Sequence, residues 1–358
     1  MNKLKESNVV MERLRRQHLL KPVRSSDDYL SLFRIMQPVS TGWFSRPGNP
    51  PVLENRASFN DSNLTDKLRR DRIIVKARFL SGNVGYVFAD QLQIYAAAFL
   101  HPLTRMNMIQ NIVFDTVQRG GPITAAQIKE ETGLLSKEIG PALQRLQRAF
   151  LVYEDQIDSD WDRAWYDFPS EWPDIDVQNI NPVEALASVL HAFLQAHVFA
   201  TIRQIADWSG LPLKKVETAS GKLASEKKVS RVCVESLGEG LVQETVPDIG
   251  TLEKYKKVIV LGKSDMLVRS HATELKQRFG GREILQYLLI DGKLIGAVVG
   301  HWRIGPHDVD DIDIHLPGDR ADERMDEVLD AVASIYHPPH STIRKYMGKP
   351  IAGLPRGD

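Results

Sequence analysis

Apolar side chains recur at the helical period in two separate stretches near the middle of the chain. In the first stretch Val113, Phe114 and Val117 fall on one face of a helix predicted over 108–118, and the second stretch predicts a helix over 183–195. Each predicted helix is followed by a threonine placed to cap a short second helix and by a glycine placed to end it. A third helix and a β-rich segment complete each stretch.

The two stretches are copies of one sequence unit, displaced by 77 positions. The same residue recurs at this offset, without a gap, in the pairs Thr124 and Thr201, Gln127 and Gln204, Ile128 and Ile205, Gly133 and Gly210, Leu134 and Leu211, Lys137 and Lys214, and Leu146 and Leu223. The third helices are predicted over 136–148 and 213–227, and the β segments over 150–156 and 229–234. Three helices with a glycine turn before the third, followed by a hairpin, indicate a helix-turn-helix with a wing.

The rest of the chain adds a unit before the repeats and a module after them. Residues 28–36 and 64–72 read as helices and 73–79 as a strand, a pattern that also fits a third, divergent copy. Asp291-Gly292 between two apolar runs predicts a hairpin, and residues 322–336 predict an amphipathic helix. The expected fold class is α+β, with tandem winged-helix units and a C-terminal β-rich module. We place the domains at 1–104 (helical, with a candidate catalytic loop), 105–180 (winged helix with an acidic connector), 181–250 (second winged helix) and 251–358 (β-rich module with a terminal helix).

Composition narrows the class of protein. A hydrophobic share of 42% and a charged share of 26% are typical of a soluble globular chain, and the single cysteine, Cys233, excludes a disulfide framework. No apolar run approaches the roughly 18 residues of a membrane span, and the first residues lack a signal-peptide core. The histidines have no partners at metal-ligand spacing. We therefore expect a soluble, cytoplasmic monomer without a metal or cofactor.

The net charge of zero conceals a division of charge along the chain. Residues 1–150 hold 22 Lys and Arg against 13 Asp and Glu, whereas residues 151–180 hold one basic and nine acidic side chains. The basic half is the candidate surface for double-stranded DNA, because a local basic patch is what binds phosphates. The acidic connector is predicted to face away from DNA and, since it contains Trp161, Trp165 and Trp172, to be packed.

Candidate DNA contacts lie on the predicted third helices and on the N-terminal unit. In winged helices the third helix enters the major groove and the flanking segments hold phosphates. The residues predicted to contact DNA are Arg69, Arg70, Arg78, Lys137, Arg145, Lys214 and Lys215. The alternatives are that these side chains serve solubility alone, or that the winged helices are protein–protein scaffolds. Trp43, Phe44 and Arg46, in a long loop, are placed either to stack on bases or to pin the loop to the core.

Two stretches carry a family resemblance. They are ATIRQIADWSGLPLKKV in the second repeat and the segment 262–303, which contains Asp265, Arg269, Asp291, Gly292, Gly296, Trp302 and Arg303. Together with the order of the units, they resemble the AlkZ/YcaQ family of winged-helix DNA glycosylases. This resemblance implies cleavage of the N-glycosidic bond of alkylated or crosslinked bases in DNA.

The resemblance also implies a catalytic Gln-x-Gln or Gln-x-Asp motif after the first N-terminal helix. Here that position reads Gln37-Pro38-Val39, so Gln37 matches the first member and valine replaces the second. Hydrolysis through an oxocarbenium-like state needs a group that positions or deprotonates water, which a glutamine amide can do and a valine cannot. The family also has a stretch that resembles Arg-x-Thr-x-His. Arg78 matches its arginine, but no histidine lies near Arg78 in this sequence.

Three interpretations of function follow from these residues. The first is a base-excision enzyme that uses Gln37 and a bound water, or an unidentified carboxylate such as Asp90. The second is a non-catalytic DNA-binding protein that has lost the second motif residue. The third is a winged-helix module that binds other proteins.

Overall fold

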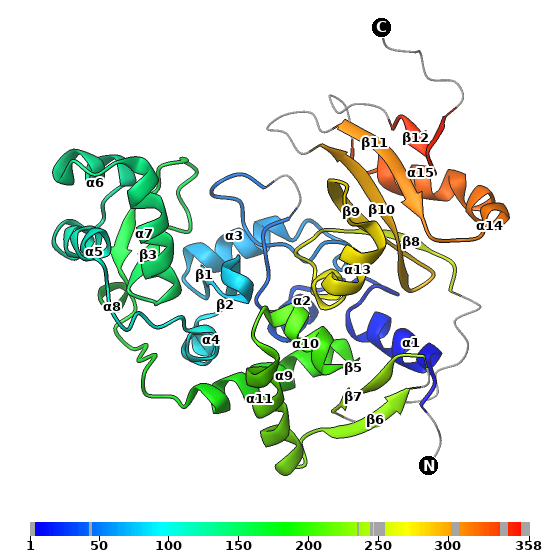
Figure 1. Ribbon diagram of the computed structural model, residues 1–358, viewed down its shortest axis with the longest axis horizontal. Helices are drawn as coiled ribbons and strands as arrows, with labels where there is room; N and C mark the ends of the chain where they lie inside the picture. The colour runs from blue at the N-terminus through cyan, green and yellow to red at the C-terminus, as the bar shows by residue number, and fades with distance from the viewer. Residues whose placement is uncertain are drawn as a thin grey trace, which may run out of the picture. The chain divides into compact units, whose positions relative to one another are not determined.

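The computed structural model describes residues 4–42, 45–234, 236–243, 246, 255–301, 308–336 and 343–351. Trp43, Phe44, Trp302 and Arg303, which the sequence singled out, lie outside these residues. Helices and strands are both abundant, so the predicted α+β class is confirmed. The chain divides into two compact units (Figure 1): unit 1 comprises Met1–Arg15, Cys233–Glu239 and Thr245–Asp358, and unit 2 comprises Arg16–Val232 and Gly240–Glu244.

The helices and strands of the first repeat confirm the predictions from its sequence. They are α5 (Met108–Gly120), α6 (Ala125–Thr132), α7 (Ser136–Arg148), β3 (Val152–Glu154) and β4 (Trp165–Asp167). Thr124 caps α6 through a reciprocal capping box with Gln127, and Gly133 ends the helix with a φ of 69°. Val113 and Val117 are fully buried in the core that these elements share. The predicted apolar face of the first helix is therefore the one that packs.

The second repeat has the same order of helices. Its elements are α9 (Pro182–His197), β5 (Phe199–Ala200), α10 (Ile202–Ser209), α11 (Leu213–Ser225), β6 (Ser230–Val234) and β7 (Gly238–Val242). Thr201 caps α10 and Gly210 ends it with a φ of 69°. Ala200 pairs with β7, just as Ile123, 77 positions earlier, pairs with β4. The offset found in the sequence therefore extends to the strand pairing.

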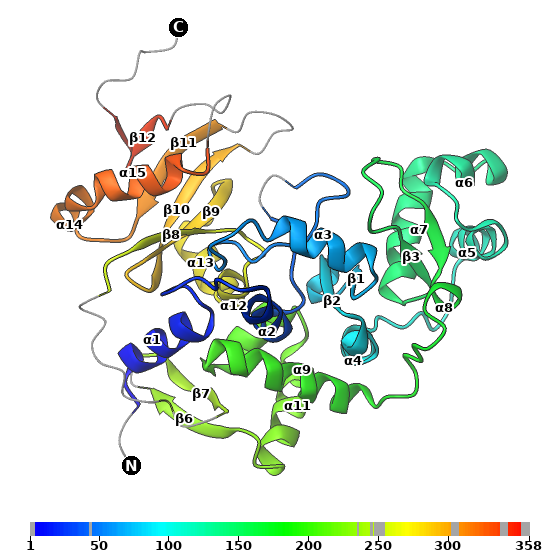
Figure 2. The same ribbon diagram turned by 180° about the vertical axis from the view of Figure 1, so that it is seen from behind.

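Unit 2 also contains the elements that precede the repeats. They are α2 (Ser26–Met36), α3 (Ser62–Arg70), β1 (Ile74–Arg78), η1 (Leu80–Gly82), β2 (Val84–Phe88), η2 (Ala89–Gln91) and α4 (Leu92–Phe99). β1 and β2 form an antiparallel hairpin, with Ile74 opposite Phe88 at one end and Arg78 opposite Val84 at the other. α2 and α4 both pack on α9, as Figures 1 and 2 show from opposite sides. α9 is therefore shared between the second repeat and the N-terminal elements.

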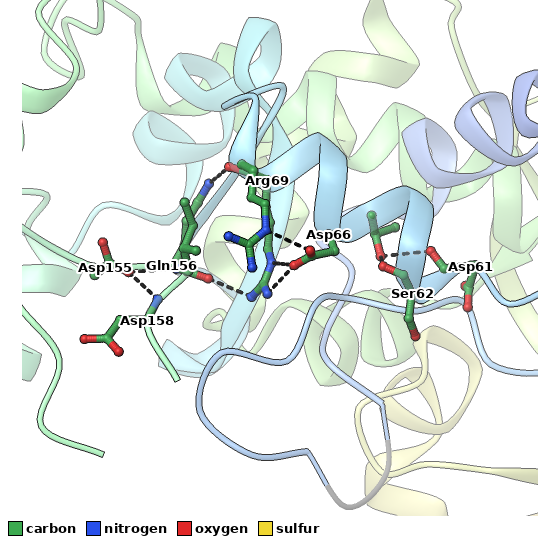
Figure 3. Close-up of polar contacts among 10 residues, drawn as sticks. Asp61, Ser62, Asp66, Arg69, Asp155, Gln156 and Asp158 are labelled. Atoms are coloured by element: carbon green, nitrogen blue, oxygen red, sulfur yellow. Dashed lines mark hydrogen bonds and ion pairs between the residues drawn. The ribbon is translucent and has the colours of Figure 1, made fainter. Parts of the chain in front are cut away.

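The acidic connector, residues 151–180, is fixed to β1 and α3 by a buried amide and a buried guanidinium (Figure 3). Gln156 accepts a hydrogen bond from the N–H of Lys76 at 2.9 Å and donates one to the carbonyl of Arg69. Arg69 donates to the Gln156 carbonyl at 2.8 Å, while Asp66 pairs with its guanidinium. The short helix α8 (Phe168–Glu171) follows β4. These contacts confirm that this end of the connector is packed.

The tryptophans of the connector differ in burial. Trp165 on β4 is 8% exposed, and Trp172 is half-buried with its ring edge to face against Tyr153. Trp161, in the loop between β3 and β4, is 72% exposed. The prediction that all three tryptophans are packed is therefore wrong for Trp161, because the loop carries it away from the strands that bury Trp165.

The glycines that end the second helix of each repeat differ in their surroundings. Both have a φ of 69°, so any side chain there is strained by roughly 1–2 kcal/mol. A Cβ on Gly133 would meet nothing within 4 Å, whereas a Cβ on Gly210 would lie 1.7 Å from the Oγ and 3.0 Å from the Cα of Ser81. The turn before α11 therefore approaches η1 so closely that only glycine fits.

We expect Gly210→Ala to lower the free energy of unfolding by at least about 1 kcal/mol more than Gly133→Ala, because only the former adds overpacking to the backbone strain. Denaturant unfolding of the two variants measures the difference. Equal losses would show that the contact between Gly210 and Ser81 relaxes without cost.

Unit 1 contains a sheet whose described strands follow the order β13-β12-β11-β10-β9-β8. The strands are β8 (Val258–Leu261), β9 (Ile284–Ile290), β10 (Lys293–His301), β11 (Asp308–Ile314), β12 (Lys345–Tyr346) and β13 (Lys349–Pro350). β9 and β10 pair antiparallel across Asp291 and Gly292, whose φ values of 51° and 82° belong to a tight hairpin turn. The hairpin predicted at these two residues is therefore confirmed.

The helices of this part of the chain are α1 (Glu6–Arg16), α12 (Met266–Ser270), α13 (Ala272–Phe279), α14 (Gly318–Glu323) and α15 (Met325–Ala333). The single helix predicted over 322–336 is wrong, because the chain leaves the helical conformation at Arg324. The guanidinium of Arg324 pairs with Asp291 at 2.6 Å and with Glu327 at 2.8 Å. None of the helices in the described part of the chain is long and apolar enough to cross a membrane.

Candidate functional site

Cationic side chains from both repeats surround His101, which follows α4. Arg148, at the C-terminal end of α7, has its Nη2 2.9 Å from Nε2 of His101, and its carbonyl accepts a hydrogen bond from the His101 N–H at 3.1 Å. Arg145, one turn earlier on α7, and Lys215, near the start of α11, both influence the pKa of His101. We refer to Arg78, Arg145, Arg148 and Lys215 as the cationic cluster.

The surroundings of His101 favour its neutral form. Burial lowers the pKa of the imidazole below 6.5, and the charges of Arg148, Arg145 and Lys215 lower that pKa further. A neutral ring accepts a hydrogen bond at one nitrogen, as the contact with Arg148 requires. No carboxylate in the described part of the chain pairs with Arg145, Arg148 or Lys215. Among the residues that the structure describes, these three positive charges therefore have no carboxylate partner, and a phosphate group would neutralise them.

Arg78 connects the cationic cluster to the β1–β2 hairpin. Its Nε donates to Gln147 of α7 at 2.6 Å, and its Nη1 donates to the carbonyl of Gly82 at 3.1 Å. Burial lowers the pKa of Arg78, which as an arginine stays charged. On the other side of the hairpin turn, Ser81 contacts Gly210. The turn therefore lies between the end of α7 and the glycine turn that precedes α11.

The other lysines predicted to contact DNA lie at different distances from the cationic cluster. Lys214 is exposed on α11 beside Lys215 and extends the positive surface there. Lys137 is exposed at the opposite end of α7 from Arg148, about 16 Å away along a helix that rises 1.5 Å per residue. The structure therefore brings Arg145 and Lys215 together around His101 and holds Arg78 against Gln147 of α7, whereas Lys137 lies at the other end of that helix.

The two predicted arginines of α3 differ sharply. Arg70 is exposed and pairs with Asp66 at 2.8 Å. Arg69 is 3% exposed and is enclosed by Asp66 and the backbone of Gln156, as Figure 3 shows. A phosphate group has no access to Arg69 in this arrangement, so we assign Arg69 to the packing of the connector and leave it out of the proposed DNA contacts.

Gln37, the candidate catalytic residue, ends α2 and is held by three hydrogen bonds. Its N–H donates to the carbonyl of Phe33 at 2.9 Å, and its Oε1 accepts from the N–H of Phe88 at 2.9 Å. Tyr95 donates its hydroxyl to the Gln37 carbonyl at 3.3 Å, and burial raises the pKa of Tyr95 so that this proton is retained. The side chain therefore has a fixed orientation, and Gln37 is only 3% exposed.

Gln37 lines a cavity of about 440 Å³ among α2, α4 and α9. Cavities that hold small ligands have volumes in this range. The lining combines polar groups, among them Arg34, Gln37 and Gln91, with the rings of Phe88 and Tyr95. Aromatic faces and a few polar groups are what recognise a base that has left the helical stack.

Val39, at the second position of the family motif, belongs to the core instead of the cavity. Its N–H donates to the carbonyl of Tyr86 at 2.9 Å, and its carbonyl accepts from the N–H of Tyr86 at 2.8 Å. The residue is 4% exposed and is not one of those that line the cavity. Its side chain has no polar atom with which to act on water.

An ion pair stands beside the cavity. Arg34, one turn before Gln37 on α2, donates from Nη1 to both carboxylate oxygens of Asp90 at 3.0 Å. Its guanidinium lies 4.2 Å from the centre of the Phe88 ring. Asp90 lies in η2 between Phe88 and Gln91, both of which line the cavity. A carboxylate is therefore placed at the edge of the cavity that contains the Gln37 amide.

The cavity and the cationic cluster lie at opposite ends of the β1–β2 hairpin. Gln37 is bonded to Phe88 at one end, and Arg78 pairs with Val84 at the other. Four residues separate Phe88 from Val84 along β2, which is about 13 Å at 3.3 Å per residue. Gln37 and Arg78 therefore both belong to unit 2 but are not in contact.

His101 and Arg34 are among the residues of these sites that were not predicted from the sequence. His101 has no local signal, because its position beside Arg148 depends on how the first repeat packs on the hairpin. Arg34 lies three positions before Gln37 on a predicted helix, and the i,i+3 spacing is the signal that would have placed both on one face.

Comparison with known proteins adds a family and a fold. A family model described as DNA glycosylase AlkZ-like matches residues 52–333. Among solved structures, the Streptomyces sahachiroi DNA glycosylase AlkZ is similar, with a TM-score of 0.67 and 15% identity over 96% of this chain and 99% of that chain. At this identity the likeness shows the fold alone. No curated protein matches the chain.

Proposed function

The chain belongs to the AlkZ-like family of DNA glycosylases, and on this basis we propose that it binds duplex DNA and hydrolyses the N-glycosidic bond of a modified base. The observation that carries the proposal is the cationic cluster around His101, to which α7 and α11 of the two repeats both contribute. Arg145 and Arg148 of one repeat and Lys215 of the other gather around one residue, and no carboxylate among the described residues pairs with them, an arrangement that would suit a continuous phosphate backbone.

The repeats are best interpreted as winged helices over 105–180 and 181–250, flanked by the units over 1–104 and 251–358. The strands β3 and β4 supply one wing and β6 and β7 the other. In this interpretation α7 and α11 are the helices that face the major groove of DNA. Arg145, Lys214 and Lys215 would then contact phosphates. Arg70 and Lys137, both exposed, are the outer contacts of a longer duplex.

The cavity around Gln37 is the proposed reaction site. A base rotated out of the duplex would enter this cavity, and the Gln37 amide would orient the attacking water. In the reaction the water oxygen bonds to C1′ of the deoxyribose, while the C1′–N bond breaks and its electron pair leaves with the base. An alkylated base that carries a positive charge departs as a neutral molecule, which makes it the favoured class of substrate.

Replacing Gln37 by alanine is expected to slow base release from a duplex that carries 7-methylguanine by about 100-fold, the scale of a group that positions or deprotonates water. The measurement is single-turnover release with protein in excess. Because the substitution also leaves the Phe88 N–H without its acceptor, Gln37→Glu, which keeps that acceptor, is compared, and the unfolding midpoints of both variants are checked. Unchanged release by Gln37→Ala would remove Gln37 from the mechanism.

A second candidate function is non-catalytic DNA binding, and the contacts of the family motif favour it. Gln37 Oε1 already accepts a hydrogen bond from a backbone N–H, and Val39 is buried and apolar. A protein of this kind would bind duplex DNA with a steep salt dependence while releasing no base above background. The same single-turnover assay therefore separates the two functions.

A further inference from the structure

We propose that Asp90 supplies the carboxylate that Val39 cannot, and that Arg34 positions it at the edge of the Gln37 cavity. This inference rests on the proposed base-excision activity and names a residue for it. The family motif expects a polar group two positions after Gln37, but Val39 is buried and does not line the cavity. The reaction still needs a group that accepts the proton of the attacking water.

Asp90 is placed to meet that need from another element. It lies in η2, flanked by Phe88 and Gln91, and these two neighbours both line the cavity. Its carboxylate is held by the guanidinium of Arg34, which lines the cavity as well. Asp90 is not itself one of the lining residues, but its carboxylate is one hydrogen bond away from Arg34, which is.

The ion pair with Arg34 holds the Asp90 carboxylate in place and leaves lone pairs on both of its oxygens free to accept further hydrogen bonds. Nη1 of Arg34 donates to both oxygens of Asp90 at 3.0 Å, and each oxygen has a second lone pair for a water molecule. The guanidinium itself is held against the Phe88 ring, 4.2 Å from its centre. The side chains of the pair are 45% and 60% exposed, so the pair is worth little to stability and substitutions in it are tolerated.

The proposed step involves the attacking water, the modified nucleotide and the Asp90 carboxylate. Water bonds through its oxygen to C1′, and the C1′–N bond breaks with its electrons passing to the base. The proton released by the water passes to the Asp90 carboxylate and from there to solvent. In the oxocarbenium-like state the carboxylate also offsets the positive charge on the sugar.

Asp90→Asn tests the role of the carboxylate, and Glu171→Gln is its matched control. Glu171 pairs with Arg72 at 2.6 Å, and Arg72 lies over the Trp172 ring at 5.4 Å, so this trio repeats the Arg34 arrangement away from the cavity. We expect Asp90→Asn to slow single-turnover base release by about 100-fold at saturating protein, with unchanged DNA affinity, and Glu171→Gln to leave release unchanged. Asp90→Glu is expected to restore part of the rate.

The outcomes separate this inference from the function on which it rests. An active wild-type protein whose Asp90→Asn variant releases base at the wild-type rate overturns the role of Asp90 alone. A wild-type protein that releases no base overturns both the role of Asp90 and the proposed excision. Loss of rate together with an equal loss of DNA affinity makes Asp90 a binding residue and also overturns the inference.

Discussion

Replacing Arg145 and Lys215 together by glutamate is expected to weaken duplex-DNA binding at least about 100-fold near physiological salt. The two side chains come from the third helices of different repeats, and no carboxylate in the described part of the chain pairs with either of them. Each substitution removes a phosphate contact and adds a repelled charge. Fluorescence anisotropy of a labelled duplex, titrated at several salt concentrations, measures the loss.

A matched variant, Lys129→Glu with Lys276→Glu, changes the net charge by the same amount at exposed lysines outside the cationic cluster. We expect its DNA affinity to fall less than about threefold, because neither lysine is one of the proposed phosphate contacts. If both double variants lost affinity equally, the binding would depend on net charge and not on the cluster.

Glu154→Gln is expected to lower the free energy of unfolding by about 3 kcal/mol, because it breaks a buried ion pair. Lys76 of β1 and Glu154 of β3 are 4% and 8% exposed and pair at 3.1 Å, and Arg163 pairs with the same carboxylate. Burial lowers the pKa of Lys76 to about 8, although Glu154 opposes the shift. Without the carboxylate, Lys76 and Arg163 lose their shared counter-ion, and Lys76 must either stay charged without it or give up its proton as its pKa falls further.

Urea unfolding measures this loss, and two further variants test its cause. Glu226→Gln breaks the pair of Glu226 with Lys222 at the surface and is expected to leave the midpoint unchanged. Lys76→Met with Glu154→Leu removes both buried charges and is expected to recover most of the stability. A Glu154→Gln protein as stable as the wild type would show that the pair contributes nothing to holding the connector on β1.

The same pair predicts how stability depends on pH. Burial alone would raise the pKa of Glu154, but Lys76 and Arg163 outweigh it and hold that pKa below 4.5. The stabilisation from Glu154 is therefore present above pH 4.5 and is lost as the pH falls through the lower pKa of the folded state. Acid unfolding of the wild type, compared with Glu154→Gln, shows this dependence.

The repeats could be predicted from the sequence because their signals are local. A capping threonine, a glycine at positive φ and an apolar stripe each act within a few residues, and all of them appear in α6 and α10. α4 was missed for the opposite reason. Its sequence LQIYAAAF is apolar on nearly every side, since it packs on α9 and lines the cavity, so it has no periodic pattern to detect.

The composition of the candidate site depends on contacts between segments that are far apart in the sequence. The sequence suggested Gln37 and Asp90 separately, and the fold is what pairs Arg34 of α2 with Asp90 of η2 and bonds Gln37 to Phe88. Arg69 was predicted to contact DNA because it is an arginine on a basic helix, and its burial against Gln156 depends on a segment 87 positions away. Charge and spacing identify candidates, and long-range contacts decide which of them share a site.

If a duplex lies across the cations of both repeats, its binding weakens steeply as the salt concentration rises, because the cations release counter-ions from the phosphates. On a duplex too short to reach Arg70 and Lys137, four neutralised phosphates at Arg145, Arg148, Lys214 and Lys215 predict a slope of log Kd against log salt of about 3.6, at about 0.9 per phosphate. The Arg145→Gln and Lys215→Gln double variant is expected to lower that slope by about 2. A flat titration of the wild-type protein, or a slope that the double variant leaves unchanged, would contradict the account.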